Sequence, residues 1–190
     1  MRYLLAFICT LAVAFPVAAQ DSGFYAGGHI GQATAKDACD NVAGPGVSCD
    51  DEDTAWKILG GYQLNRNLGL ELGYTDLGEV SASGPGGTAS VEAKALELVG
   101  VGSLPLGERF SVYGKAGVYR GETDATASTA LLTGSFSETN NDLTFGVGAR
   151  YDLTQNVALR AEWQRYADVG GGEIGESDVD VLSVGALFRF

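Results

Sequence analysis

Residues 59–78 read LGGYQLNRNLGLELGYTDLG, in which two alternating segments flank a short polar turn. With a period of two, one face of the second segment carries Leu68, Leu70, Leu72 and Tyr74. The opposite face holds glycines, Thr75 and the lone Glu71. A soluble hairpin would turn a charged face toward water, but this face is mostly glycine. The pattern instead predicts a hairpin whose apolar face meets lipid, with tyrosines near the interfaces and Glu71 in a narrow lumen.

The composition favours one ordered domain that does not bind nucleic acid. The chain has 190 residues, of which 45% are hydrophobic, and it combines 28 glycines with only four prolines. A chain of this length and apolar content is large enough for a single core. The formal net charge of −12 leaves no basic surface to neutralise phosphates, so nucleic acid is not expected as a partner.

Residues 1–19 have the organisation of a secretory signal peptide. Arg2 precedes an apolar run from Tyr3 to Phe15, and the small residues Val17, Ala18 and Ala19 stand before Gln20. The apolar run is too short to span a bilayer comfortably. We therefore predict that residues 1–19 are removed and that residues 20–190 form the mature barrel domain.

Two cysteines remain in the expected mature chain, Cys39 and Cys49, within a polar segment. In an exported protein this favours a disulfide, which would contribute about 3 kcal/mol in the chain-entropy model. A metal site is the alternative. Two thiols without a nearby histidine are a poor zinc ligand set, and the acidic run 50–53 lacks the spaced oxygens of a calcium loop, so no metal is predicted.

Alternation with a period of two dominates the rest of the chain. It predicts eight strands, at 22–34, 54–64, 68–78, 90–104, 109–121, 140–153, 157–167 and 179–190. Three connections are tight turns, at 65–67, 106–108 and 154–156, and four are long and polar, at 35–53, 79–89, 122–139 and 168–178. We therefore predict an all-β fold: an eight-stranded antiparallel up-and-down transmembrane β-barrel with short periplasmic turns and long extracellular loops.

One hairpin pattern occurs twice. GYQLNRNLGLELGY at 61–74 aligns without gaps on RYDLTQNVALRAEW at 150–163, which matches Asn67 to Asn156 and Leu70 to Leu159. The match is too limited for a solenoid, whose repeats would fill the whole chain. The similarity is explained by two hairpins that both need a tight polar turn between alternating strands.

The last strand, DVDVLSVGALFRF, alternates apolar residues and ends on Phe190. Together with GGYQLNRNLGLELGYTDLG and GVGARYDLTQNVALRAEWQRY, it resembles the OmpA-like family of eight-stranded outer-membrane β-barrels over the whole mature chain. The resemblance implies the outer membrane of a Gram-negative bacterium, contact with its lipid and lipopolysaccharide, and Phe190 as a signal for periplasmic chaperones and the barrel-assembly machinery. Some members carry a peptidoglycan-binding domain after the barrel. None follows Phe190 here, so we expect no tethering by such a domain.

The candidate site is a set of polar residues on predicted inward faces. Because charge on the lipid face is costly, these should point inward and pair. They are His29, Glu71, Glu97, Lys115, Arg150, Arg160, Glu162 and Arg189. In the family, acidic and basic residues at such positions form a network that fills the lumen. Glu71, Arg150 and Arg160 fall on matching positions, although the acid and base identities differ.

The sequence contains no assembled catalytic motif. The single histidine is not accompanied by a serine and an acid on one exposed face, and the glycines at 84–87 and 100–102 do not open a helix after a strand. We therefore predict no enzymatic activity, no catalytic residue and no cofactor.

Three functions are compatible with the pattern. The first is a monomeric outer-membrane barrel that supports envelope integrity and presents acidic loops for adhesion or recognition. The alternative is a narrow porin-like channel for small solutes or ions, although eight strands leave little room for water. A soluble lipocalin-like binder would need an apolar interior and a polar exterior, the reverse of the predicted faces. We favour the first.

Overall fold

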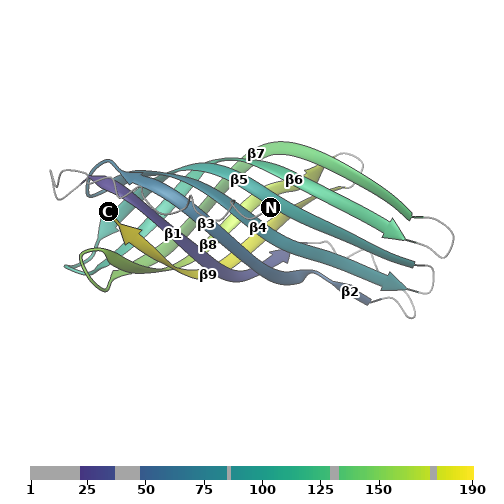
Figure 1. The fold of residues 1–190 in the computed structure, drawn as a ribbon, viewed down its shortest axis with the longest axis horizontal. Coiled ribbons are helices and arrows are strands. Elements are labelled where there is room, and N and C mark those ends of the chain that lie inside the picture. The colour runs from purple at the N-terminus through teal and green to yellow at the C-terminus, as the bar shows by residue number, and fades with distance from the viewer. Residues whose placement is uncertain (1–21, 37–47, 85–86, 129–132, 172–174) are drawn as a thin grey trace, which may run out of the picture.

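The computed structural model describes residues 22–36, 48–84, 87–128, 133–171 and 175–190. The described chain is built from strands (Figure 1). They are β1 (Gly23–Ala35), β2 (Ser48–Asp50), β3 (Glu52–Gln63), β4 (Leu68–Gly84), β5 (Gly87–Pro105), β6 (Phe110–Ser128), β7 (Thr133–Asp152), β8 (Val157–Gly171) and β9 (Gly175–Arg189). These residues include no helix of the length and apolar character needed to cross a membrane.

The strands close into a barrel in the order of the chain. β1 pairs with β3, and each later strand pairs antiparallel with the next up to β9, which returns to β1. β2 is a three-residue strand from the first connection and pairs only with β4. The barrel proper therefore has eight strands, as predicted, and its closure satisfies the backbone hydrogen bonds that a bilayer could not.

The repeated hairpin pattern corresponds to a repeated turn. Asn65 Oδ1 accepts the N–H groups of Asn67 (2.9 Å) and Leu68 (3.0 Å), and Thr154 Oγ1 accepts those of Asn156 (3.2 Å) and Val157 (3.0 Å). The matched asparagines then hold each turn to a neighbouring strand. Asn67 Nδ2 donates to the Ser103 carbonyl and Asn156 Nδ2 to the Arg189 carbonyl, both at 2.9 Å. The alignment of the two hairpins thus reflects one turn chemistry used twice.

The outer surface is apolar and bounded by two aromatic belts. Near the short turns the belt contains Phe24, Tyr62, Phe110, Tyr151, Phe188 and Phe190. Toward the other end it contains Trp56, Tyr74, Phe145 and Trp163. Between the belts, aliphatic side chains such as Leu72, which is 55% exposed, point outward. This is the lipid-facing band of an outer-membrane barrel, and the predicted orientation of the opening stretch is correct.

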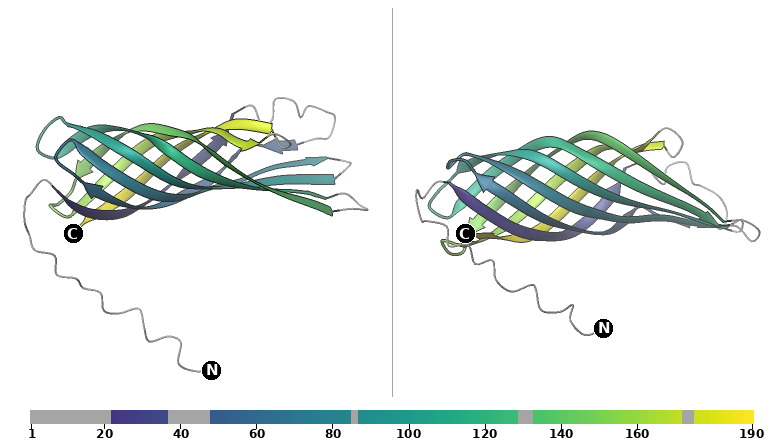
Figure 2. Two further views of the ribbon diagram at one scale, coloured as in Figure 1. Left: turned by 90° about the horizontal axis from the view of Figure 1, so that it is seen from above. Right: turned by 45° about the horizontal axis from the view of Figure 1, so that its top comes forward.

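The strands extend further at the loop end than the sequence predicts. β4, β5, β6 and β7 continue as paired strands through most of the predicted connections 79–89 and 122–139, and β8 and β9 do so through part of 168–178. These segments beyond the lipid band carry few large apolar residues, so their alternation with period two is weak, and the register set inside the membrane continues outward. Their projection from the barrel is visible in Figure 2. We call residues 77–84, 87–95, 120–128 and 133–143 the β4–β7 extension.

Candidate functional site in the barrel lumen

The lumen is filled by side chains in three layers. At the loop end lies an apolar layer made of Ala33, Ala35, Ala55, Leu77, Ala95, Tyr119, Tyr166, Val169, Val179 and Val181. At the turn end a smaller apolar cluster contains Tyr25, Leu59, Ala158 and Leu187. The six buried charged residues, Lys57, Glu71, Glu97, Lys115, Arg160 and Glu162, lie between these two layers. The polar network is therefore enclosed along the barrel axis as well as by the wall.

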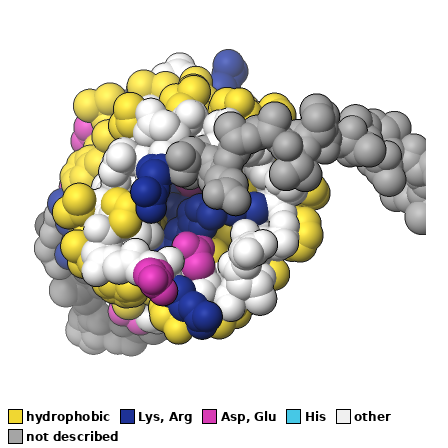
Figure 3. All heavy atoms as spheres, turned by 90° about the vertical axis from the view of Figure 1, so that its left-hand side faces the viewer, with side chains coloured by type: hydrophobic (Ala, Val, Ile, Leu, Met, Phe, Trp, Pro, Cys, Tyr) yellow, Lys and Arg dark blue, Asp and Glu magenta, His cyan; other side chains and the backbone are white. Residues whose placement is uncertain are grey.

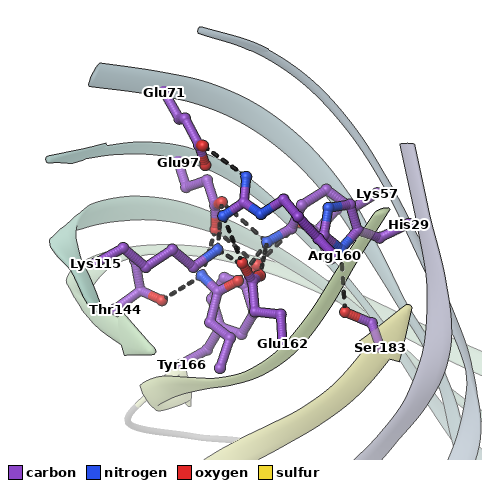
Figure 4. A network of polar contacts seen from close by, with 12 residues as sticks. His29, Lys57, Glu71, Glu97, Lys115, Thr144, Arg160, Glu162, Tyr166 and Ser183 are labelled. Carbon is purple, nitrogen blue, oxygen red and sulfur yellow. Dashed lines mark hydrogen bonds and ion pairs between the residues drawn. The ribbon is translucent and has the colours of Figure 1, made fainter. Parts of the chain in front are cut away.

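The central layer holds three acids and three bases. Glu71, Glu97 and Glu162 are each no more than 2% exposed, and they face Lys57, Lys115 and Arg160 (Figure 4). With all six ionised the layer is neutral. Removing charges from water is costly, so such a set is tolerated only when each charge has close, well-oriented partners.

The two lysines share two carboxylates. Lys57 Nζ lies 3.0 Å from Glu97 and 3.5 Å from Glu162, and Lys115 Nζ lies 2.6 Å from Glu162 and 3.6 Å from Glu97. Lys57 also donates to Gln164 Oε1. Each lysine thus sits between the same acids, and β3, β5, β6 and β8 are joined across the lumen.

Arg160 joins the other half of the network. Its Nη1 lies 2.7 Å from Glu71 Oε1, its Nη2 lies 3.0 Å from Glu162 Oε2, and its Nε donates to the Tyr113 hydroxyl at 2.9 Å. The guanidinium also stacks over the Tyr113 ring at 4.1 Å. A planar group with several fixed donors suits this position better than an ammonium would.

Tyrosine hydroxyls complete the carboxylate contacts, and glycines make room for the rings. Tyr25 donates to Glu71 at 2.8 Å and Tyr113 donates to Glu162 at 2.7 Å. A Cβ at Gly61 would lie 2.3 Å from the Tyr25 ring, and one at Gly148 would lie 2.4 Å from the Tyr113 ring. The inward glycines of the predicted alternation therefore give space to specific neighbours in a narrow lumen.

Three of the residues proposed from sequence lie at the margin of the network. His29 is buried and its Nδ1 lies 3.3 Å from Ser183 Oγ, while its Nε2 has no hydrogen-bond partner among the described atoms. Arg150 bonds to Asp152 in its own strand, at 2.8 and 2.5 Å. Arg189 is partly buried beside Tyr25 at the turn end. Seen from this end, charged side chains gather in a hollow surrounded by hydrophobic ones (Figure 3).

Sequence reasoning missed several members of the network. Lys57 lies between the outward-facing Trp56 and Ile58 in the run AWKIL. The alternation of side chains along a strand therefore predicts that Lys57 points inward. Gln164 and Tyr166 bind Glu97 Oε2 at 2.6 and 2.7 Å, and their positions follow from the same alternation. The partners themselves could not be assigned, because they depend on how far each strand is offset around the barrel.

Cys39 lies outside the described residues, so the structure does not address its proposed bond to Cys49; the predicted signal peptide lies outside them as well. Phe190 is exposed at the turn end, where its N–H donates to the Phe24 carbonyl at 3.1 Å. Its role in assembly stays a prediction.

Comparison with known proteins agrees with this architecture. Outer membrane protein A of Yersinia pseudotuberculosis is 30% identical over 185 residues, which cover 95% of this chain and 51% of that protein. Outer membrane protein A of Serratia marcescens is 30% identical over 174 residues, which cover 90% of this chain and 45% of that protein. The chain spans about half the length of these curated relatives.

Solved barrels share the fold at low identity. Neisserial surface protein A gives a TM-score of 0.63 at 19% identity, covering 89% of this chain and 99% of that one. OprG of Pseudomonas aeruginosa gives a TM-score of 0.61 at 18% identity, covering 91% of this chain and 99% of that one. The OmpA-like transmembrane domain matches residues 19–190. The chain is therefore a non-enzymatic β-barrel of the Gram-negative outer membrane and belongs to the family of OmpA-like transmembrane domains.

Proposed function

We propose that this outer-membrane barrel is a sealed structural protein that supports envelope integrity and presents an acidic loop end for adhesion or recognition. The observation that carries the first part is the filled lumen, in which a neutral ionic layer lies between two apolar layers. Such an interior fills a narrow lumen with paired side chains, which supports a structural role more than a conducting one.

The charge of the β4–β7 extension supports the second part. Its acidic residues are Glu79, Glu92, Glu122, Asp124, Glu138 and Asp142, whereas its only bases are Lys94 and Arg120. Lys94 pairs with Glu92 at 2.8 Å. A projecting surface with this excess of acid attracts basic partners and repels polyanions.

A narrow channel is the second candidate, and the hollow at the turn end favours it. Charged side chains line this opening, as in a vestibule (Figure 3). The hollow leads toward the layers that contain Leu187 and Arg160, both of which are buried. We therefore rank the sealed barrel above the channel.

A deletion strain tests both parts of the proposal. It should become sensitive to detergent, and resistance should return with the wild-type barrel and equally with a variant in which the extension acids are changed to amides. Binding of the cells to a cationic surface should return only with the wild type. Restored resistance without any difference in binding would remove the recognition role. Unchanged resistance on deletion would remove the envelope role.

A further inference from the structure

The two sides of the β4–β7 extension end differently. β7 pairs with β6 continuously from Thr133 to Tyr151, but its pairing with β8 begins only at Thr144. Among the described residues, no strand pairs with the outer side of β7 between Thr133 and Leu143. A strand edge of this length is a template for another strand.

The edge exists because β8 turns away from β7. The register of β8 against β9 shifts between Tyr166 and Val169, and Asp168 has a φ of 51°. Val169 is consequently buried in the loop-end apolar layer. Asn140 Nδ2 donates to the Asp168 carbonyl at 2.5 Å, which links the departing strand to β7 through a side chain.

The opposite side of the extension is protected. β2 pairs with Ser81, Ala82 and Ser83 of β4, and a bulge at Gly78, with a φ of 80°, interrupts the pairing of β4 with β5. Short added strands and bulges are common ways to block an edge, as are lysine and proline. The segment 133–143 has no proline and no lysine, and its pairing with β6 has no register shift. In the described part of the chain, one edge is therefore blocked and the other is available.

The backbone groups at this edge can be assigned. The N–H of Leu153 donates to the Val157 carbonyl at the start of β8, whereas the N–H of Asp152 donates to Arg109 on the side of β6. The odd-numbered residues of β7 therefore face β8, and because β7 pairs with β6 without a register shift, those before Thr144 face the same way. Leu143 is consistent with this, since its N–H is bound by Asp142 Oδ1 at 2.7 Å, a side chain of its own strand. The N–H and carbonyl groups of Ser137, Thr139 and Asn141 should therefore be directed outward from the sheet.

We propose that the edge of β7 between Thr133 and Leu143 binds an extended, basic segment of a partner protein by strand addition. This inference rests on the recognition role proposed above and names the partner's chemistry. Glu138 and Asp142 lie on the edge strand, and Glu122 and Asp124 lie beside it on β6. Main-chain hydrogen bonds supply affinity, and the acids select lysine or arginine at alternating positions. A second copy would bring the same acids against this edge and be repelled.

Binding of synthetic peptides to the barrel in lipid nanodiscs tests the inference. The probe is a short fluorescent peptide of alternating lysine and valine, measured by anisotropy. It should bind, whereas the same peptide with N-methyl groups on alternate amides and a glutamate–valine peptide should not. Equal binding of the N-methylated peptide would overturn strand addition, and equal binding of the acidic peptide would overturn the charge preference. Concentration-dependent dimerisation that excludes the peptide would overturn the choice of partner.

A matched pair of variants locates the site. Ser137→Pro removes an edge-directed N–H that no strand of the barrel uses, and Ser137→Ala removes only the hydroxyl. Both should show the heat-modifiable migration of a folded barrel. Affinity for the lysine–valine peptide should fall about tenfold in Ser137→Pro, about 1.4 kcal/mol, and stay unchanged in Ser137→Ala. Equal affinities in the two variants would overturn the inference.

The same variants separate this inference from the proposed function. If the acid-to-amide variant loses binding of cells to a cationic surface, but Ser137→Pro and Ser137→Ala bind the lysine–valine peptide equally in nanodiscs, the recognition role stands and the edge site is overturned. If peptide binding in nanodiscs follows the prediction but wild-type cells show no surface binding, the edge site stands and the recognition role is overturned.

Discussion

Each buried carboxylate in the lumen is held by residues from distant parts of the chain. Glu71 on β4 is bound by Tyr25 from β1 and Arg160 from β8, and its second oxygen has no hydrogen-bond partner among the described atoms. Among the described residues, Arg160 is the only counter-charge at bonding distance from Glu71. A pair of this kind contributes little net stability while intact, but the loss of one member leaves a stranded charge.

Arg160→Met should therefore destabilise the barrel by about 3–5 kcal/mol, because Glu71 would stay buried without its counter-charge. Adding Glu71→Met should recover part of this loss, and urea unfolding of the four proteins in lipid gives the coupling energy. Arg150→Met is the matched control. Arg150 pairs with Asp152, whose side chain is 30% exposed, so we expect a loss of only about 1 kcal/mol. A loss of similar size in Arg150→Met and Arg160→Met would contradict the enclosed network.

Cys39 and Cys49 give a second prediction at this scale. Both belong to the first loop-end connection of an exported chain, so we expect a disulfide. Thiol labelling of the mature protein, denatured without reductant, should modify neither cysteine, and labelling after reduction should modify both. Two reactive thiols before reduction would show that the bond is absent.

At the residue scale, the sequence predicts which way a side chain points better than it predicts which residue the side chain contacts. Period two gives the inward orientation of Glu71, Glu97 and Glu162, because successive side chains of a strand point to opposite faces. It does not give the contact between Arg160 and Glu71, which lie on opposite sides of the barrel and meet only because of the offset between strands. Lys57 was overlooked although the same rule applies to it.

At the scale of elements, turns and strand ends follow different physics. Two of the three tight turns contain their own hydrogen-bonding side chains, Asn65 and Thr154, so their positions could be read from the sequence. The loop ends of β4 to β7 have little apolar alternation, and only pairing with neighbours makes them strands. The predicted boundaries were therefore accurate at the turn end and too short at the loop end.

Arginine substitutions at Leu72 and Thr88 test the same contrast. Leu72 faces outward between the aromatic belts, so Leu72→Arg places a charge in the lipid band at a cost of about 2–4 kcal/mol. Thr88→Arg adds the same side chain to an exposed position near the tip of β5, outside the band. We expect poor insertion of the first variant and normal insertion of the second, measured by heat-modifiable migration of outer-membrane extracts. Equal assembly would mean that the lipid-facing assignment is wrong.

At the scale of the whole molecule, the barrel contains barriers in series. The ionic layer lies next to the loop-end apolar layer, and Tyr166 belongs to both, because its ring packs at 5.3 Å from that of Tyr119 while its hydroxyl donates to Glu97. Arg160, by contrast, bonds to Glu71, Glu162 and Tyr113, none of which belongs to the loop-end layer, so a change at Arg160 should leave that layer in place. Since an apolar constriction excludes water and ions, the loss of one charge should not open the lumen.

Conductance across planar bilayers tests this arrangement. The wild type, Arg160→Met and Tyr119→Ala should each show no steady conductance, because either the ionic layer or the loop-end apolar layer remains closed in every case. The double variant, which leaves only the smaller turn-end cluster, should conduct. Heat-modifiable migration must first show that each variant is folded. Steady conductance in Arg160→Met alone would mean that the ionic layer is the only barrier, and it would favour the channel. A silent double variant would instead assign the seal to the turn-end cluster, where Leu187 and Tyr25 remain packed below the vacated space.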